Sequence, residues 1–78
     1  MKVFKVTFVN NEPVTITDVS EKTILEGSHH CVHTNGKIIY ALVKSETELD
    51  VLEKVGLMVA EVKALYSMKN TAEPDTIV

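Results

Sequence analysis

Arginine and tryptophan are absent from this chain of 78 residues, and cysteine occurs once. One cysteine excludes an internal disulfide, so we expect so short a chain to rely on its core, on a metal or on self-association. Arginine is the residue best suited to bidentate recognition of phosphate and guanine, and here all eight basic residues are lysines. A net charge of −3 also differs from the basic surface typical of nucleic-acid binding. We therefore expect no nucleic-acid partner.

Aromatic residues make up only 5% of the chain, against 45% for all hydrophobic residues, so the core must rest on valine, isoleucine and leucine. The longest strongly apolar run, residues 38–43, is far shorter than the roughly 20 residues of a membrane-spanning helix. Lys5 interrupts the first apolar stretch, which argues against a signal peptide. Because a single free thiol suits a reducing compartment, we expect a cytoplasmic protein with no membrane contact.

Residues 1–19 predict a first β-hairpin. Residues 1–9 alternate between the two sides of a strand, and residues 14–19 are rich in β-branched side chains. The intervening Asn10-Asn11-Glu12-Pro13 has the composition of a turn. The apolar side of the first strand carries Phe4, Val6 and Phe8. A four-residue loop would pair Val9 with Val14, Thr7 with Ile16, and Lys5 with Asp18 as an ion pair.

A second hairpin is predicted around Asn35-Gly36, which lies between the segments 29–34 and 37–44. This dipeptide is the strongest short signal for a type I′ turn, because both of its central residues need a positive φ. Residues 20–27, between the hairpins, give no clear signal. The pair next to the turn is predicted to be Thr34 with Lys37. The predicted pairs on one face are His33 with Ile38, Cys31 with Tyr40 and His29 with Leu42, and those on the other are Val32 with Ile39 and His30 with Ala41.

The rest of the chain predicts one long helix. Ser45 as N-cap and Glu48 three residues later form a capping-box pattern, and the helix would run from about residue 46 to about residue 69. Asn70 would be its C-cap, and Pro74 would prevent continuation. A broad apolar stripe repeats with helical period. Its members are Val51, Leu52, Val55, Met58, Val59, Val62, Leu65 and Tyr66.

These elements predict an α+β fold, in which two antiparallel β-hairpins form a four-stranded sheet packed by one long C-terminal helix as a two-layer sandwich. The domain would comprise residues 1–70, and residues 71–78 would be a disordered tail. We expect the helix to cover the sheet face that carries Phe4, Val6 and Phe8 together with Ile39, Ala41 and Val43. The opposite face would then look outward.

The three histidines and the cysteine fall together in residues 29–33. On a strand His29, Cys31 and His33 share a face, and side chains two residues apart lie about 7 Å apart. Imidazole and thiolate suit Zn²⁺, but a fourth ligand would have to be an Asp, a Glu or water, because no other Cys or His exists. The simpler interpretation is a polar set on a partly exposed strand. A metal site and a pH-sensitive interface remain alternatives.

We expect the outward sheet face, with Ile38, Tyr40 and Leu42, to serve as a partner surface. The opposite side of the helix carries Glu53, Lys54 and Glu61, together with a thin apolar line of Leu57, Ala60, Ala64 and Met68. The simpler interpretation of this line is that alanine is a good surface helix former, and the alternative is a helix-mediated contact. No phosphate loop or hydrolase motif is present. The sequence therefore predicts a small non-catalytic domain without a cofactor that forms a homodimer and contacts protein partners. The alternative is a metal-binding or redox- or pH-sensing domain that uses His29–His33.

Overall fold

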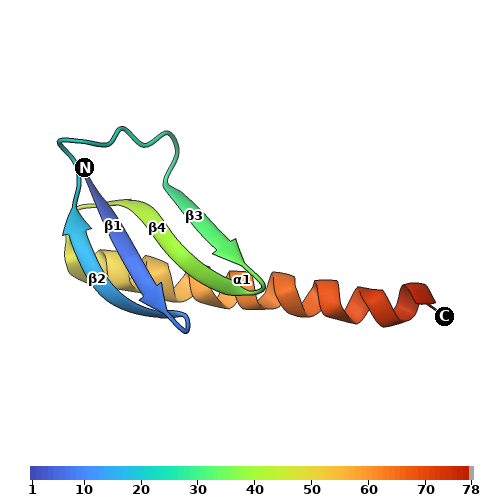
Figure 1. The fold of residues 1–78 in the computed structure, drawn as a ribbon. Coiled ribbons are helices and arrows are strands. Elements are labelled where there is room, and N and C mark those ends of the chain that lie inside the picture. The colour runs from blue at the N-terminus through green and yellow to red at the C-terminus, as the bar shows by residue number, and fades with distance from the viewer. Residues whose placement is uncertain (78) are drawn as a thin grey trace.

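The computed structural model describes the backbone of residues 1–77 and the side chains of residues 1–67. It contains four strands and one helix along that range: β1 (Lys2–Val9), β2 (Glu12–Asp18), β3 (His29–Thr34), β4 (Lys37–Ser45) and α1 (Glu48–Ile77). The strands form one antiparallel sheet in the order β2-β1-β4-β3. The helix crosses a single face of this sheet (Figure 1). The predicted α+β architecture of two hairpins and one helix is confirmed.

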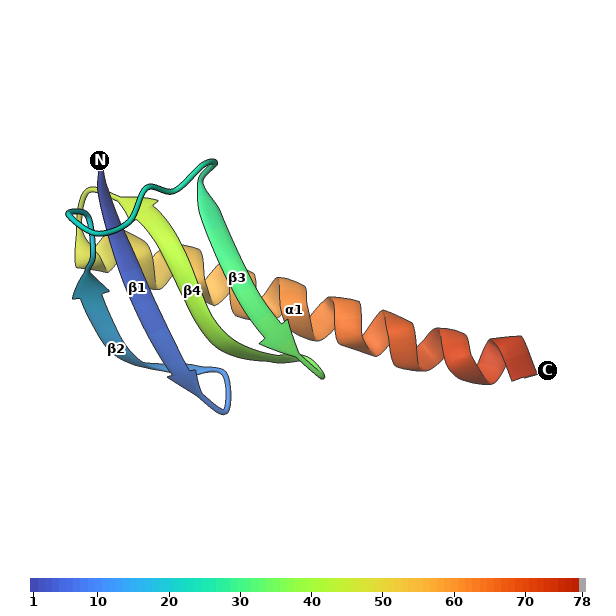
Figure 2. The ribbon, with the colours of Figure 1, turned by 45° about the horizontal axis from the view of Figure 1, so that its top comes forward.

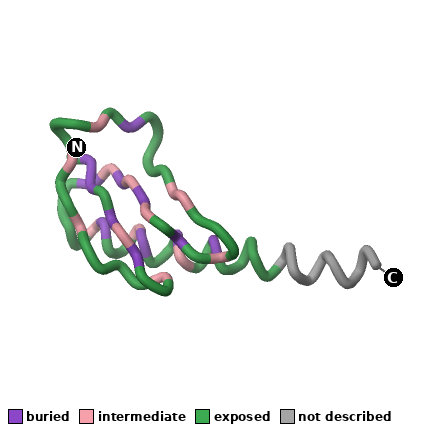
Figure 3. The backbone as a smooth tube through the Cα atoms, viewed as in Figure 1, coloured by how far each residue is buried: buried purple, intermediate pink, exposed green. Residues whose placement is uncertain are grey.

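The core lies between the sheet and α1. Val6, Ala41, Val43 and Val51 are inaccessible to solvent there, and Figure 3 shows the buried positions of β1, β4 and the helix. The remaining buried members of the core are Phe4, Phe8, Ile38, Val55, Met58 and Val62. The aromatic residues of β1 therefore face the helix, as the alternating pattern predicts.

The turn between β1 and β2 is tighter than predicted. Asn10 and Asn11 both have positive φ, 52° and 65°, which asparagine tolerates better than most residues. This two-residue turn and a bulge after Thr7 together replace the expected four-residue loop, so Lys5 lies opposite Thr17 and the predicted Lys5–Asp18 ion pair is wrong. The bulge absorbs the extra residue beside Pro13, and proline, which has no N–H to donate, is acceptable in this edge strand.

The turn between β3 and β4 has the predicted geometry. Asn35 and Gly36 have φ values of 51° and 76°, and the first pairs, Thr34 with Lys37 and His33 with Ile38, are as expected. A β-bulge then shifts the register by one residue. Beyond it the pairs are Val32 with Tyr40, Cys31 with Ala41, His30 with Leu42, and His29 with Val43.

The bulge changes which residues of β4 face the helix. Ile38 is buried in the core, Ile39 is half exposed, and Tyr40 and Leu42 lie on the sheet face away from α1. The prediction that Ile38 shares the outward face with Tyr40 and Leu42 is therefore wrong, as is the placement of Ile39 in the core. A one-residue slip exchanges the two faces of a strand, and here the slip begins at Ile39.

A loop of residues 19–28 joins the hairpins and crosses the end of the sheet where β1 begins and β4 ends (Figure 2). Val19 N donates to Val3 O at 2.9 Å, Val3 N donates to Ser20 Oγ at 2.9 Å, and Lys44 N donates to Ser28 O at 3.0 Å. Val3 and Leu25 are buried but do not belong to the core under the helix. The loop therefore covers one end of the sheet face that α1 leaves open.

The start of α1 lies two residues beyond the predicted capping box. Thr47 is the N-cap, since its Oγ1 accepts from Asp50 N at 3.1 Å and its carbonyl accepts from Val51 N at 3.1 Å. Ser45 instead ends β4, where it is fully buried and its hydroxyl bonds the Asp50 carboxylate and the Thr47 carbonyl. The strand thus continues through the residue expected to begin the helix.

The far end of α1 also differs from the prediction. The helix is continuous to Ile77, past the expected end near residue 69, and no glycine follows Lys69 to form a left-handed C-cap. The side chains of the predicted tail, 71–78, and Val78 itself lie outside the described residues. Disorder of that segment stays a prediction.

Gly36 provides a stability test with a matched control. A Cβ built on Gly36 would lie 2.9 Å from Tyr66 Cβ and Cγ, whereas a Cβ on Gly27, which also has positive φ, meets nothing within 4 Å. We expect Gly36→Ala to lower the free energy of unfolding by about 2–4 kcal/mol and Gly27→Ala by about 1–2 kcal/mol, as measured by urea unfolding. Equal losses would contradict the close approach of Tyr66, and so would a Gly36→Ala loss that Tyr66→Ala fails to reduce.

Asp50 provides a pH test. Hydrogen bonds from Ser45 and then Lys54 hold the pKa of its carboxyl below the ordinary value, so the folded state is favoured above the unfolded-state pKa. That stabilisation is lost as the pH falls through the lower, folded-state pKa. We expect Asp50→Asn to flatten the decline of stability below about pH 5, as measured by thermal unfolding across pH. Asp18→Asn should remove a separate part of this decline in stability, because hydrogen bonds from Ser20 lower the pKa of Asp18 in the same way. An unchanged acid slope in Asp50→Asn would contradict the assignment.

Candidate functional site

The histidine–cysteine cluster lies in a shallow groove between β3 and α1. His29, Cys31 and His33 line one wall, and the groove has a volume of about 160 Å³. The helix supplies the other wall with Met58, Glu61, Val62 and Leu65. The groove exists because β3 is an edge strand, so its side chains reach past the core to the flank of the helix.

These three residues share a face, as predicted, but the face is the one turned toward α1. The bulge pairs Cys31 with the buried Ala41, whereas the predicted register pairs it with Tyr40. The expectation that the cluster looks outward beside Tyr40 and Leu42 is therefore wrong. His30 is the member that points to the open face, opposite Leu42.

The chemistry of the groove is that of a protonated thiol. Burial, and secondarily the negative charge of Glu61, raise the pKa of Cys31. A reactive cysteine has the opposite character, with a pKa lowered by nearby positive charge or a helix N-terminus. The His29 ring lies 3.1 Å from the neighbouring Ser28 hydroxyl, so that its hydrogen-bonding contact is local. The arrangement does not activate Cys31 as a nucleophile.

The predicted metal site would use His29, Cys31 and His33 of this cluster as ligands. Zinc requires its ligands to converge within about 2.0–2.3 Å of one point. Over the residues that the structure describes, no group of three or more His, Cys, Asp or Glu side chains is placed to hold a metal ion. The groove brings His29, Cys31, His33 and Glu61 to its walls without such convergence.

The groove continues along α1. A second hollow of about 250 Å³ shares His29, Met58 and Glu61 with the first and adds Ser28, Lys54 and Leu57. Lys54 is held in place, since its Nζ donates to Lys44 O at 2.8 Å and lies 3.0 Å from Asp50 Oδ2. This part of the surface therefore leads from the histidine cluster to the exposed side of the helix at Leu57.

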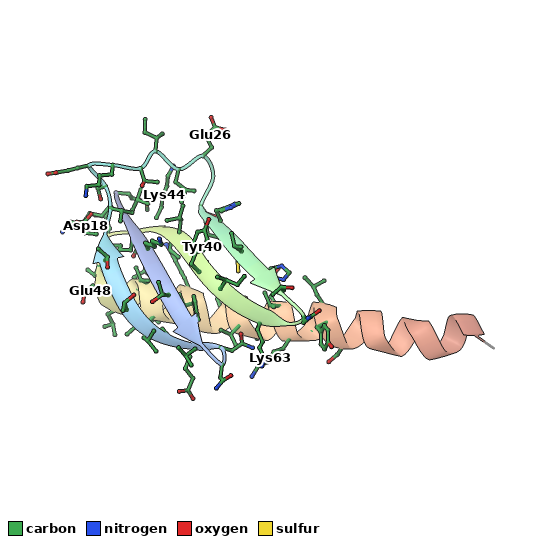
Figure 4. All side chains as sticks on the ribbon, viewed as in Figure 1. Asp18, Glu26, Tyr40, Lys44, Glu48 and Lys63 are labelled. Carbon is green, nitrogen blue, oxygen red and sulfur yellow. The ribbon has the colours of Figure 1, made fainter. Side chains whose placement is uncertain are left out.

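The open sheet face, away from α1, carries both polar and apolar side chains. Lys5 lies over the ring of Tyr40, 5.1 Å from its centroid, and Thr7 bonds Thr15 through their hydroxyl groups. Figure 4 shows Tyr40 on this face of β4. Tyr40 and Leu42 are only partly exposed. The predicted apolar partner surface is thus reduced to a mixed face on which Tyr40 already has a cation as a neighbour.

A third hollow, of about 530 Å³, lies beside the end of β2 and the following loop. Its wall includes Asp18 and Ser20, but these two are hydrogen-bonded to each other. The backbone N–H and the hydroxyl of Ser20 both donate to the Asp18 carboxylate. Their polar groups stabilise the bend of the chain at this point, and no convergent set of functional groups is gathered there.

The side of α1 away from the sheet is the most apolar exposed surface. Leu49 is 70% exposed, Leu57 is 73% exposed and Leu52 is 43% exposed. Gly56, Ala60 and Ala64 are exposed on the same side. We call this surface the outer face of α1, and define it by Leu49, Leu52, Gly56, Leu57, Ala60 and Ala64. It contains the predicted contact residues Leu57, Ala60 and Ala64; Met68, in the same predicted line, has a side chain outside the described residues.

Leu49, Leu52 and Gly56 are members of the outer face that sequence reasoning missed. The predicted core stripe is too broad, because the sheet buries only the narrow line Val51, Val55, Met58 and Val62, spaced by four, three and four residues. Leu52, Leu65 and Tyr66 were expected in that stripe and are exposed instead. A strict spacing of three and four residues would have separated Leu52 from the core line.

Comparison of the chain with protein-family models, with curated proteins and with solved structures finds no match. Over the described residues, no helix has both the length and the apolar character needed to cross a bilayer. The function is therefore argued from the geometry of the groove and of the outer face of α1.

The effect of Glu61 on the Cys31 pKa can be tested directly. Glu61→Gln removes a negative charge that raises the Cys31 pKa, so we expect faster alkylation by iodoacetamide at pH 8. The gain should be no more than about threefold, because burial is the larger cause. Glu12→Gln, at the far edge of the sheet, is the control and should leave the rate unchanged. An unchanged rate in Glu61→Gln would contradict the electrostatic coupling across the groove.

Proposed function

We propose that this chain is a small non-catalytic interaction domain that self-associates through the outer face of α1. The observation that carries the proposal is that α1 is apolar on two opposite sides, and the sheet covers only one of them. The uncovered side also carries Glu53, but most of its exposed side chains are apolar or small. Covering these side chains with a partner would remove apolar surface from water.

The size of the exposed surface supports this proposal. Leu49 and Leu57 each expose about 70% or more of their area, and they lie two helical turns apart with Glu53 midway between them and Gly56 and Ala60 beside them. Single exposed leucines are normal on soluble proteins, but several apolar side chains grouped on one side of a helix favour a contact site. A chain of 78 residues also gains more than a large one from burying further apolar surface.

The open sheet face is the weaker candidate for this contact. Its Tyr40 ring is covered by Lys5, and its Thr7 and Thr15 bond each other. Of the predicted sheet contacts, Ile38 lies in the core, and only Tyr40 and Leu42 remain on this face. We assign them a secondary role, as a surface that stays available for a different protein partner when the helix face is occupied.

Metal binding or redox or pH sensing at His29–His33 is the second candidate function. The observation in its favour is that Glu61 of α1 lines the same groove as His29, Cys31 and His33, and a carboxylate is what these three lack for a four-ligand zinc site. We place it second because the four groups do not converge over the described residues. The free thiol supports the further proposal of a cytoplasmic location.

Ala60→Glu tests the proposed function. An unpaired charge placed on the outer face should weaken the dimer at least tenfold, because burying it would cost more than about 1.4 kcal/mol, while the stability of the monomer should change little at so exposed a site. The measurement is sedimentation velocity across protein concentrations, in EDTA. Ile24→Glu is the control, since Ile24 is 96% exposed but lies in the loop of residues 19–28.

Two results would contradict the proposal. The wild-type chain sedimenting as a monomer at every concentration would exclude self-association, and equal weakening by Ile24→Glu would exclude the outer face as its location. A dimer that is lost in EDTA and in Cys31→Ser, with one zinc per chain by native mass spectrometry, would favour the second candidate instead.

A further inference from the structure

We infer that two copies of this chain pair through the outer face of α1 with their helices antiparallel, so that Glu53 of each copy lies level with Lys63 of the other. The twofold axis passes midway between Gly56 and Ala60. This inference rests on the proposed self-association and adds its orientation and register. A symmetric dimer of this kind uses the same patch on both subunits.

Glu53 and Lys63 lie inside the contact, closer to its centre line than Leu52 or Leu57. At 100° per residue, the two lie about 40° to either side of the line that runs along the outer face through Leu49 and between Gly56 and Ala60. Both are exposed, and Figure 4 shows Lys63 extending from α1 away from β3. Among the side chains that the structure describes, neither takes part in an ion pair. Both charges are therefore available to a second copy.

Charge complementarity selects the orientation. In a parallel pair, each residue lies level with its own copy, so Glu53 would meet Glu53 and Lys63 would meet Lys63. In an antiparallel pair centred between Gly56 and Ala60, the two opposite charges meet twice, once at each end of the contact. Like charges held together are unfavourable and opposite charges are favourable by similar amounts, so both terms disfavour the parallel pair.

The shapes of the side chains agree with the same register. It places Gly56 opposite Ala60 at the twofold axis, where two small residues allow the helices to approach closely, and Leu52 opposite Ala64, a large side chain against a small one. Glycine within a helix costs about 1 kcal/mol relative to alanine. A Cβ on Gly56 would meet nothing within 4 Å, so no contact inside the chain requires the glycine. The close approach of a second helix would account for a glycine at position 56.

The pairing determines the architecture of the dimer. Each sheet packs on the side of its helix opposite the outer face, so the assembly has four layers, in the order sheet, helix, helix, sheet. The open sheet faces, with Tyr40 and Leu42, form the two outer surfaces. The dimer would then present two copies of that face in opposite directions, which suits a domain that links two partners.

Charge reversal tests the orientation by sedimentation equilibrium. Glu53→Lys alone and Lys63→Glu alone each convert two attractive contacts into two repulsive ones, and each should raise the dimer Kd about tenfold. The double variant, Glu53→Lys with Lys63→Glu, restores opposite charges and should return the Kd to within about threefold of the wild type. Glu12→Lys is the control for net charge and should have little effect.

Engineered disulfides give a second readout that does not depend on affinity. Glu53→Cys and Lys63→Cys chains, each also carrying Cys31→Ser, are mixed and oxidised at equal concentration. The antiparallel register predicts that the mixed disulfide between the two variants predominates. The parallel arrangement predicts disulfides within each variant instead.

These experiments distinguish the antiparallel register from the proposed self-association. A wild-type chain that never dimerises overturns both. A wild-type dimer that is weakened by Ala60→Glu but shows no rescue in the double charge reversal, or forms disulfides within each variant, overturns the antiparallel register and leaves the outer face as the contact.

Discussion

The carboxamide of Asn11 joins the two hairpins beside the β-bulge of β4. Its Nδ2 donates to Gly36 O at 2.9 Å, and its Oδ1 accepts from Ile38 N at 2.8 Å. The bonded N–H belongs to the residue before the β-bulge, where the backbone ladder is interrupted. Asn11 thereby stabilises a register in which Ile38 enters the core and Cys31 pairs with Ala41.

That register determines what each surface of the molecule can do. Because Cys31 faces the helix, its thiol is partly desolvated beside Glu61 and stays protonated, so the histidine–cysteine cluster becomes the wall of a groove. Because Ile38, Ala41 and Val43 fill the same face, α1 is held along one narrow line of valines and a methionine. The leucines on its other side are left in contact with solvent, and they carry the proposed function.

The features predicted correctly from the sequence are those set by neighbouring residues. Asn35-Gly36 determines its own turn, and the alternation of Phe4, Val6 and Phe8 determines the core face of β1. The bulge at Ile39 was missed because it depends on the side chain of Asn11, more than 20 residues away in the chain. The helix start was misplaced because Ser45 is buried at the end of a strand, a tertiary effect that leaves Thr47 as the N-cap. Neighbouring residues thus determine the strands, the turns and the helix. Long-range contacts determine which of their residues face the core.

If a second copy of the chain covers the outer face of α1, the backbone amide NMR spectrum must change with protein concentration. On dilution through the dimer–monomer transition, the largest shift changes should fall on residues 49–64 at outer-face positions such as Gly56 and Ala60. The amides of β3 and the open sheet face should change little. Largest changes at Tyr40 and Leu42, or a spectrum that is independent of concentration, would contradict a dimer formed through the outer face.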